Sequence, residues 1–143
     1  MCDYCDCRSE PEIAALSADH DQLTSILHEL RQAAEAADHE LLVRTAVDLR
    51  SRLNQHASRE EQGLFVQLRA EVGDAYVEAF AADHDRIHAL VAAAADGDVG
   101  AAKDLDRVLR DHILLEESDL FPAAHQLLSP AQWDALAQLM SRS

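Results

Sequence analysis

Apolar residues recur at steps of three, four or seven along almost the whole chain, and this period limits the possible folds more than any other feature. It is the period of an amphipathic α-helix, in which one stripe of side chains faces the core. Helix breakers are scarce, with four Gly and three Pro in 143 residues, and Ala, Leu and Val dominate the apolar residues. The chain is therefore predicted to be all-α and long enough to bury one core.

The few breakers divide the pattern into four long helices and a short one. Ser9 and Pro11 mark the first helix start, and Ser129-Pro130 begins the short helix, whose apolar face is expected to pack on one end. Short connections favour antiparallel neighbours. We predict an up-down-up-down four-helix bundle with a short C-terminal fifth helix over 9–143, after a Cys-rich tail over 1–8. The long helices are expected over about 9–37, 40–71, 75–95 and 99–128.

The charge balance is strongly acidic. Lys and Arg number 12 and Asp and Glu number 27, which gives a net charge of −15. Phosphate backbones and anionic lipids repel such a chain, which argues against nucleic-acid and membrane partners. No apolar run approaches the roughly 20 residues of a membrane-spanning helix, and the acidic N-terminus does not resemble a secretory signal. We expect a cytoplasmic monomer or homodimer whose charge is partly offset by bound cations.

The chain contains an internal repeat of a helical hairpin. The segment 19–23 (DHDQL) resembles the segment 83–87 (DHDRI), which lies 64 residues later. The segment 56–61 (HASREE) resembles the segment 112–117 (HILLEE), which lies 56 residues later. Each half therefore carries one histidine on its first helix and a His-x-x-x-Glu motif on its second.

The spacing of the motif places its two side chains on one helix face. Residues four apart are separated by about 40° around a helix, so each His-x-x-x-Glu pair presents a nitrogen and a carboxylate together. The other histidines continue the apolar stripes of the first and third helices. The polar residues expected to point into the core are His20, His56, Glu60, His84, His88, His112 and Glu116.

Two buried glutamates need a positively charged partner. A lone histidine on an apolar stripe is more often an ordinary core residue, but burying an unpaired carboxylate costs several kcal/mol. The matching inward positions carry no Lys or Arg, so a bound metal cation is the predicted partner. Five imidazoles and two carboxylates exceed the needs of one ion, which indicates two ions bridged by Glu60 and Glu116.

The types of ligand atom also indicate which metal is bound. The donor set holds too much nitrogen for magnesium or calcium, and a closed tetrahedral zinc site would not need bridging acids. Two iron ions fit best, with mixed iron–manganese or iron–zinc occupancy left open.

The combined motifs resemble those of the hemerythrin-like family, also called HHE cation-binding domains, over about residues 10–128. The resemblance implies a four-helix bundle with a non-haem di-iron centre that binds oxygen, nitric oxide or peroxide. It implies Glu60 and Glu116 as bridges, together with an oxo or hydroxo group. By position, it implies one iron on His20 and His56 and the other on His84, His88 and His112.

Two positions leave the ligand set open. In oxygen-carrying hemerythrins the last acid lies five residues after its histidine, which here is Glu117. Helix geometry and the repeat favour Glu116, so Glu117 is the second choice, because it would need a local distortion of the helix. Glu61 is the corresponding alternative in the first half, and Thr24 stands where a counterpart of His88 would lie. Three histidines without repeat partners are expected on the surface or at helix ends: His28, His39 and His125.

The Cys-rich tail is a second candidate site. Cys2, Cys5 and Cys7 suit thiolate coordination of zinc, with a fourth ligand from a histidine such as His125 or His28. A redox or sensing role is an alternative, because exposed reduced thiols are oxidisable. A tail whose cysteines do little is the third interpretation.

Three functions follow from a di-iron centre. The preferred one is sensing or binding of oxygen, nitric oxide or peroxide. The second is a catalase-like enzyme that dismutates hydrogen peroxide, and the third is storage of oxygen or iron. No Ser-His-Asp constellation, Gly-rich phosphate loop or paired-acid hydrolase pattern points to other chemistry.

Overall fold

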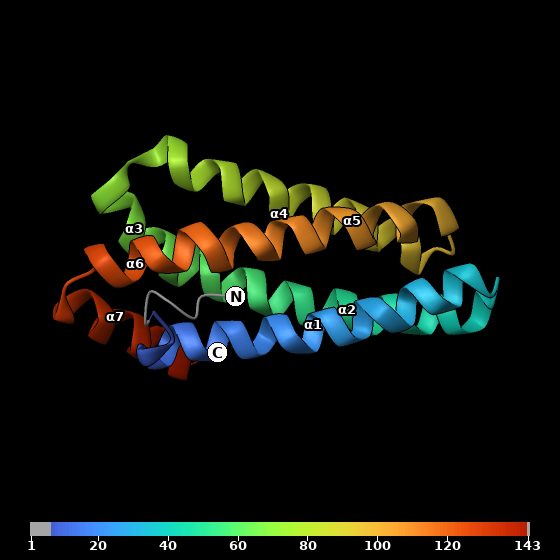
Figure 1. The fold of residues 1–143 in the computed structure, drawn as a ribbon, viewed down its shortest axis with the longest axis horizontal. Coiled ribbons are helices and arrows are strands. Elements are labelled where there is room, and N and C mark those ends of the chain that lie inside the picture. The colour runs from blue at the N-terminus through green and yellow to red at the C-terminus, as the bar shows by residue number, and fades with distance from the viewer. Residues whose placement is uncertain (1–6, 143) are drawn as a thin grey trace.

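The computed structural model describes residues 7–142, and the regular elements of this part of the chain are all helical. Four long helical rods lie side by side, each antiparallel to the next (Figure 1). The first rod is α1 (Pro11–Glu35) and the third is α4 (Asp74–Ala95). The other two rods each consist of three successive elements. The second rod contains α2 (His39–Arg59), η2 (Glu60–Leu64) and α3 (Phe65–Val72). The fourth rod contains α5 (Val99–Leu115), η3 (Glu116–Leu120) and α6 (Phe121–Leu127).

Each rod packs against two others, so the four close into a bundle. α1 contacts α2 and α5, and α4 contacts the same two helices from the other side. The predicted up-down-up-down four-helix bundle is thereby confirmed. None of the helices within residues 7–142 is both long enough and apolar enough to cross a membrane.

The helix starts follow local capping chemistry. Pro11 occupies the first turn of α1, where its missing N–H is not needed. The residue at the cap is Glu10 rather than Ser9, which belongs to the short 3₁₀ turn η1 (Cys7–Ser9). The side chains of Asp38 and Asp98 accept backbone N–H groups at the starts of α2 and α5. The two tight connections between rods are therefore set by capping aspartates.

The short fifth helix is also present. It is α7 (Pro130–Ser141), and it begins with a reciprocal capping box between Ser129 and Gln132. Trp133 and Leu136 are its buried residues. They pack into the apolar cluster at the end of the bundle where α3 and α6 lie. This agrees with the prediction that the apolar face of the helix covers one end.

The second and fourth rods each contain one wide turn, at matching places. The backbone N–H of Phe65 donates to the carbonyl of Glu60, five residues earlier, and Phe121 does the same to Glu116. These are π-helical turns, which hold one residue more than an α-helical turn. The helices predicted over these residues are present, but their wide turns were not anticipated from the sequence. The wide turn brings residues five apart onto the same face, so each glutamate and its phenylalanine are buried together.

The apolar core consists of two clusters. The first fills the half of the bundle that contains the α1–α2 and α4–α5 connections, and includes Leu27, Leu49, Val91 and Leu105. The second fills the half that α7 closes, and includes Leu16, Phe65, Phe80, Phe121 and Leu136. The polar residues of interest fall between them. On α1, for example, His20 lies between Leu16 of the second cluster and Leu23 of the first.

Candidate metal centre

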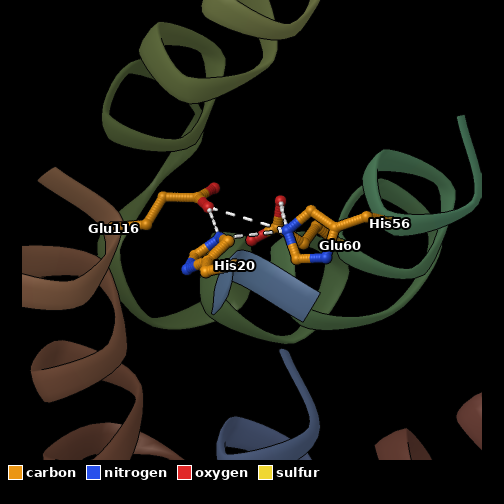
Figure 2. Close-up of side chains that lie close together, drawn as sticks. All are labelled: His20, His56, Glu60 and Glu116. Carbon is orange, nitrogen blue, oxygen red and sulfur yellow. Dashed lines mark hydrogen bonds and ion pairs between the residues drawn. The ribbon is translucent and has the colours of Figure 1, made fainter. Parts of the chain in front are cut away.

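Six buried side chains from all four rods converge between the two apolar clusters. Their nitrogen and oxygen atoms form two groups, and within each group the candidate ligand atoms lie within 4.8 Å of one another. Both groups contain the same two carboxylates. The first group, shown in Figure 2, consists of His20, His56, Glu60 and Glu116. The second group consists of His84, His112 and the same two glutamates.

Each carboxylate lies between histidines of different halves of the repeat. The two oxygens of Glu116 are 2.9 Å from Nε2 of His20 and 3.1 Å from Nε2 of His112. Oε1 of Glu60 is 3.2 Å from Nε2 of His56 and 3.2 Å from Nε2 of His84. The four imidazoles therefore turn the same nitrogen inward, and the two glutamates are placed to bridge two cations.

The charges at the centre fit a metal cation. Glu60 and Glu116 have no exposed surface. Although these atoms lie close to one another, neither oxygen of Glu60 forms a hydrogen bond of good geometry with a described residue, and the same holds for Oε2 of Glu116 and Nε2 of His112. Burying such groups without partners costs several kcal/mol. Their ion-pair neighbours within residues 7–142 are histidines only, and a neutral imidazole cannot balance a carboxylate. A bound cation supplies the missing charge and the missing contacts.

In the metal-free protein, protons take the place of the cation. Burial alone would lower the pKa of His20, but hydrogen bonds to Glu116 and Glu117 outweigh it and raise the pKa to about 9. The same balance, with Glu116 and Glu60 as partners, raises the pKa of His84 to about 10. Burial would raise the pKa of Glu116, yet the facing histidines hold it well below its usual range. A cation that binds here must displace these protons.

The outward nitrogens of the histidines also have carboxylate partners. Nδ1 of His56 donates to Asp19 over 2.9 Å, and Nδ1 of His112 donates to Asp83 over 3.2 Å. Such contacts fix the ring orientation and tautomer and leave Nε2 free for a metal. The sequence analysis missed both aspartates. The signal was present, because each directly precedes the histidine of its own helix in both halves of the repeat.

The other two outward nitrogens face the second glutamate of the opposite half. Nδ1 of His20 donates to Glu117 over 3.1 Å, whereas Nδ1 of His84 is 3.7 Å from Glu61. Phenylalanines from the wide turns stack on the same two rings. Phe121 lies on His20 with ring centroids 5.5 Å apart, and Phe65 lies on His84 with centroids 5.4 Å apart. The π turns therefore shape the centre, because they bring these rings to the face of the glutamates.

The alternatives in the predicted ligand set lie apart from the six converging residues. Glu116 belongs to both groups, whereas Glu117 and Glu61 approach only the outer side of a histidine. His88 lies one turn beyond His84, with the two ring centroids 6.5 Å apart, and is outside both groups. It lines a cavity of about 10 Å³, whose other walls are site histidines and apolar side chains such as Leu53, Ile87 and Leu109.

The remaining predicted residues lie elsewhere. Cys2 and Cys5 are outside the described residues, and Cys7 is buried in the apolar cluster next to α7. Burial and the nearby charge of Glu117 raise the pKa of the Cys7 thiol. His28 and His39 are exposed, and His125 is partly exposed and pairs with Glu10 over 3.5 Å. None of these histidines joins either group of candidate ligands in the described structure.

An antiparallel four-helix bundle with two buried His–Glu groups is characteristic of a metal-cation-binding protein. The family model described as the hemerythrin HHE cation-binding domain matches residues 12–124, so the chain belongs to this family. Searches of curated proteins and of solved structures returned no significant match. Family membership confirms the resemblance inferred from the motifs and establishes cation binding as the general function.

Proposed function

We propose that the chain is a non-haem di-iron protein of the cytoplasm that binds oxygen, nitric oxide or peroxide and acts in sensing or binding these molecules. The observation that carries the proposal is the fully buried pair Glu60 and Glu116, each lying between two inward imidazoles. One ion would lie at His20 and His56 and the other at His84 and His112. Glu60 and Glu116 would bridge, with His88 as the further ligand that the family pattern predicts.

The donor atoms support iron over other cations. Four imidazole nitrogens with two carboxylates are unsuited to magnesium or calcium and suit a transition metal. Two shared carboxylates leave each ion with few protein donors and hence with room for a small ligand. Iron bound here would supply reversible oxidation and reduction and an affinity for small oxidants.

The size of the adjacent cavity supports a ligand of very few atoms. Its volume of about 10 Å³ is near the minimum that admits a single water molecule. Leu53, Ile87 and Leu109 on its walls offer no hydrogen bonds to a larger polar substrate. Oxygen, nitric oxide and hydrogen peroxide each have only two non-hydrogen atoms, so they need the least widening of this cavity. Asp19 and Asp83 would meanwhile hold the His56 and His112 rings in place during binding.

The Cys-rich tail adds a separate proposal, namely zinc binding or thiol oxidation by Cys2, Cys5 and Cys7. Support comes from the clustering of the thiols in the sequence. Zinc coordination by Cys7 requires its side chain to leave the apolar cluster, where it is fully buried. Zinc analysis of a variant without the three cysteines tests this proposal independently of the bundle.

Metal analysis and spectroscopy test the di-iron proposal. Protein loaded anaerobically with ferrous iron should hold two ions per chain, and His56→Ala should hold fewer. His28→Ala, an exposed change on α1, should still hold two. A reversible spectral change under oxygen or nitric oxide supports binding, whereas sustained oxygen release from peroxide supports the catalase-like alternative. More than two ions per chain supports storage. Fewer than two ions in the unmodified protein would refute the di-iron centre.

A further inference from the structure

The two halves of the centre differ in how their outer carboxylates are held. Ser17 lies on α1 and is only 2% exposed. Its hydroxyl donates to Oε2 of Glu117 over 3.0 Å, while Oε1 of Glu117 accepts Nδ1–H of His20 over 3.1 Å. Arg8 adds a longer contact of 3.5 Å to the same oxygen. Glu117 is therefore fixed from several sides, and it in turn fixes the His20 ring.

Within residues 7–142, the other half has no equivalent of this arrangement. The repeat offset of 64 residues that relates His20 to His84 places Ala81 where the first half has Ser17. Glu61 therefore meets no hydroxyl from that position. Its side chain is 40% exposed, against 6% for Glu117. Its oxygen lies 3.7 Å from Nδ1 of His84, beyond hydrogen-bond distance, and that nitrogen has no hydrogen-bond partner among the described residues.

We propose that Ser17 is a positioning residue that acts through Glu117 and strengthens only the metal position formed by His20 and His56. The inference rests on the two-ion centre proposed above. An outer carboxylate that holds Nδ1 orients the ring and increases its basicity, so that the metal is bound more tightly. The hydroxyl of Ser17 fixes the carboxylate in this role. Because Ala81 has no hydroxyl, the position of His84 and His112 lacks this reinforcement.

The two variants Ser17→Ala and Ala81→Ser test the inference in opposite directions. Iron-loaded protein is mixed anaerobically with an excess of a ferrous chelator, and release is followed by the absorbance of the chelate. Two phases are expected, one for each ion. Asp19→Asn assigns the phase of the first position, because Asp19 contacts His56, and Asp83→Asn assigns the other through His112.

Ser17→Ala should increase the rate of iron release from the position of His20 and His56, which is the phase that Asp19→Asn identifies, by about three- to ten-fold. The rate of the other phase should stay unchanged. This is less than the 10- to 100-fold loss typical when a direct partner of a metal ligand is removed. Ala81→Ser should slow only the phase that Asp83→Asn moves. Ser25→Ala removes an exposed hydroxyl from the same helix, where it donates to the carbonyl of Asp21, and should move neither phase.

The outcomes separate the inference from the proposed function. Fewer than two ions before chelation would refute the di-iron centre itself. Two ions lost in one concerted phase would refute the inference alone. The inference alone would also be refuted if Ser17→Ala changed the rates of both phases or of neither. The same holds if Ala81→Ser slowed neither phase. The slowing is informative, because a defect in folding cannot produce it, and helix content from circular dichroism checks the folding of Ser17→Ala.

Discussion

Raising the pH of the metal-free protein from about 6.5 to about 9 is expected to destabilise it. The pKa of His20 is raised to about 9 and that of His84 to about 10, because Glu116 and other carboxylates face the rings despite burial that opposes their charge. A pKa that is higher in the folded state stabilises the fold fully below the unfolded value of about 6.5. That stabilisation is lost as the pH rises through the folded pKa.

The size of the effect follows from the same values. For His20, the difference between about 9 and the ordinary 6.5 corresponds to about 3 kcal/mol. The contributions of the histidines do not add, because neighbouring imidazolium ions repel one another: the charge of His56 lowers the pKa of His20. We therefore expect a total loss on the order of 3 to 5 kcal/mol, most of it by about pH 9. In a chain of this size the loss lowers Tm by roughly 10 °C.

The assay is thermal unfolding followed by circular dichroism, with a strong chelator present and pH varied between about 6 and 9. The range stops at the ordinary pKa of a cysteine thiol, because Cys7 has a raised pKa and adds its own dependence above it. Glu116→Gln is the control variant, since it removes the charge that the histidines face and should flatten the dependence. A Tm that stays constant or rises over this range in the unmodified protein would show that the reasoning is wrong.

Three further predictions concern the centre and its surroundings. Iron affinity should fall as the pH is lowered below about 9, because the cation competes with protons on histidines whose pKa is raised, to about 9 for His20. Titration at several pH values measures this. Asp19→Asn and Asp83→Asn should each weaken iron binding by about 10- to 100-fold in the same titration, with little change in helix content. Gly63→Ala should cost about 1 kcal/mol net and lower Tm by roughly 2 to 4 °C, because the new Cβ would lie 2.7 Å from Leu136 and 2.9 Å from Leu139. This clash outweighs the roughly 0.5–1 kcal/mol that Ala gains over Gly within a helix. Equal affinity at all pH values, unchanged binding in both aspartate variants, or an unchanged Tm for Gly63→Ala would each contradict its prediction.

The fold was predictable because its determinants are local and periodic. The apolar stripes define the rods, and Asp38, Gly97 and Ser129 mark connections that the structure confirms. A spacing of four on a helix fixes the direction of both side chains, and the burial of His56, Glu60, His112 and Glu116 agrees with the direction predicted. The direction of the His56 and Glu60 side chains could be predicted without knowing which helices lie next to them.

The features that the sequence analysis missed depend on contacts between rods. The wide turn at Glu60 brings Glu60 and Phe65 together against neighbouring helices, and intrinsic helix propensity does not distinguish it from an α-helical turn. The partner of His56, Asp19, projects from another helix 37 residues away. The partner of His20, Glu117, lies 97 residues away. The repeat singles out Asp19 and Asp83 as candidates, but which histidine each contacts depends on how the helices cross.

The position of the centre between two apolar clusters has a consequence for the cooperativity of unfolding. In the metal-free chain, the two clusters are joined by four helix backbones and by the layer of buried His–Glu pairs between them. The bundle then resembles two small cores in series, and each can open with its own free energy. A cation bound by residues from all four rods ties the layer together, so that opening either cluster disturbs its ligands. Cation binding therefore determines whether the chain unfolds as one unit or in two parts, and amide hydrogen exchange in the Leu49 and Phe80 regions would report the difference.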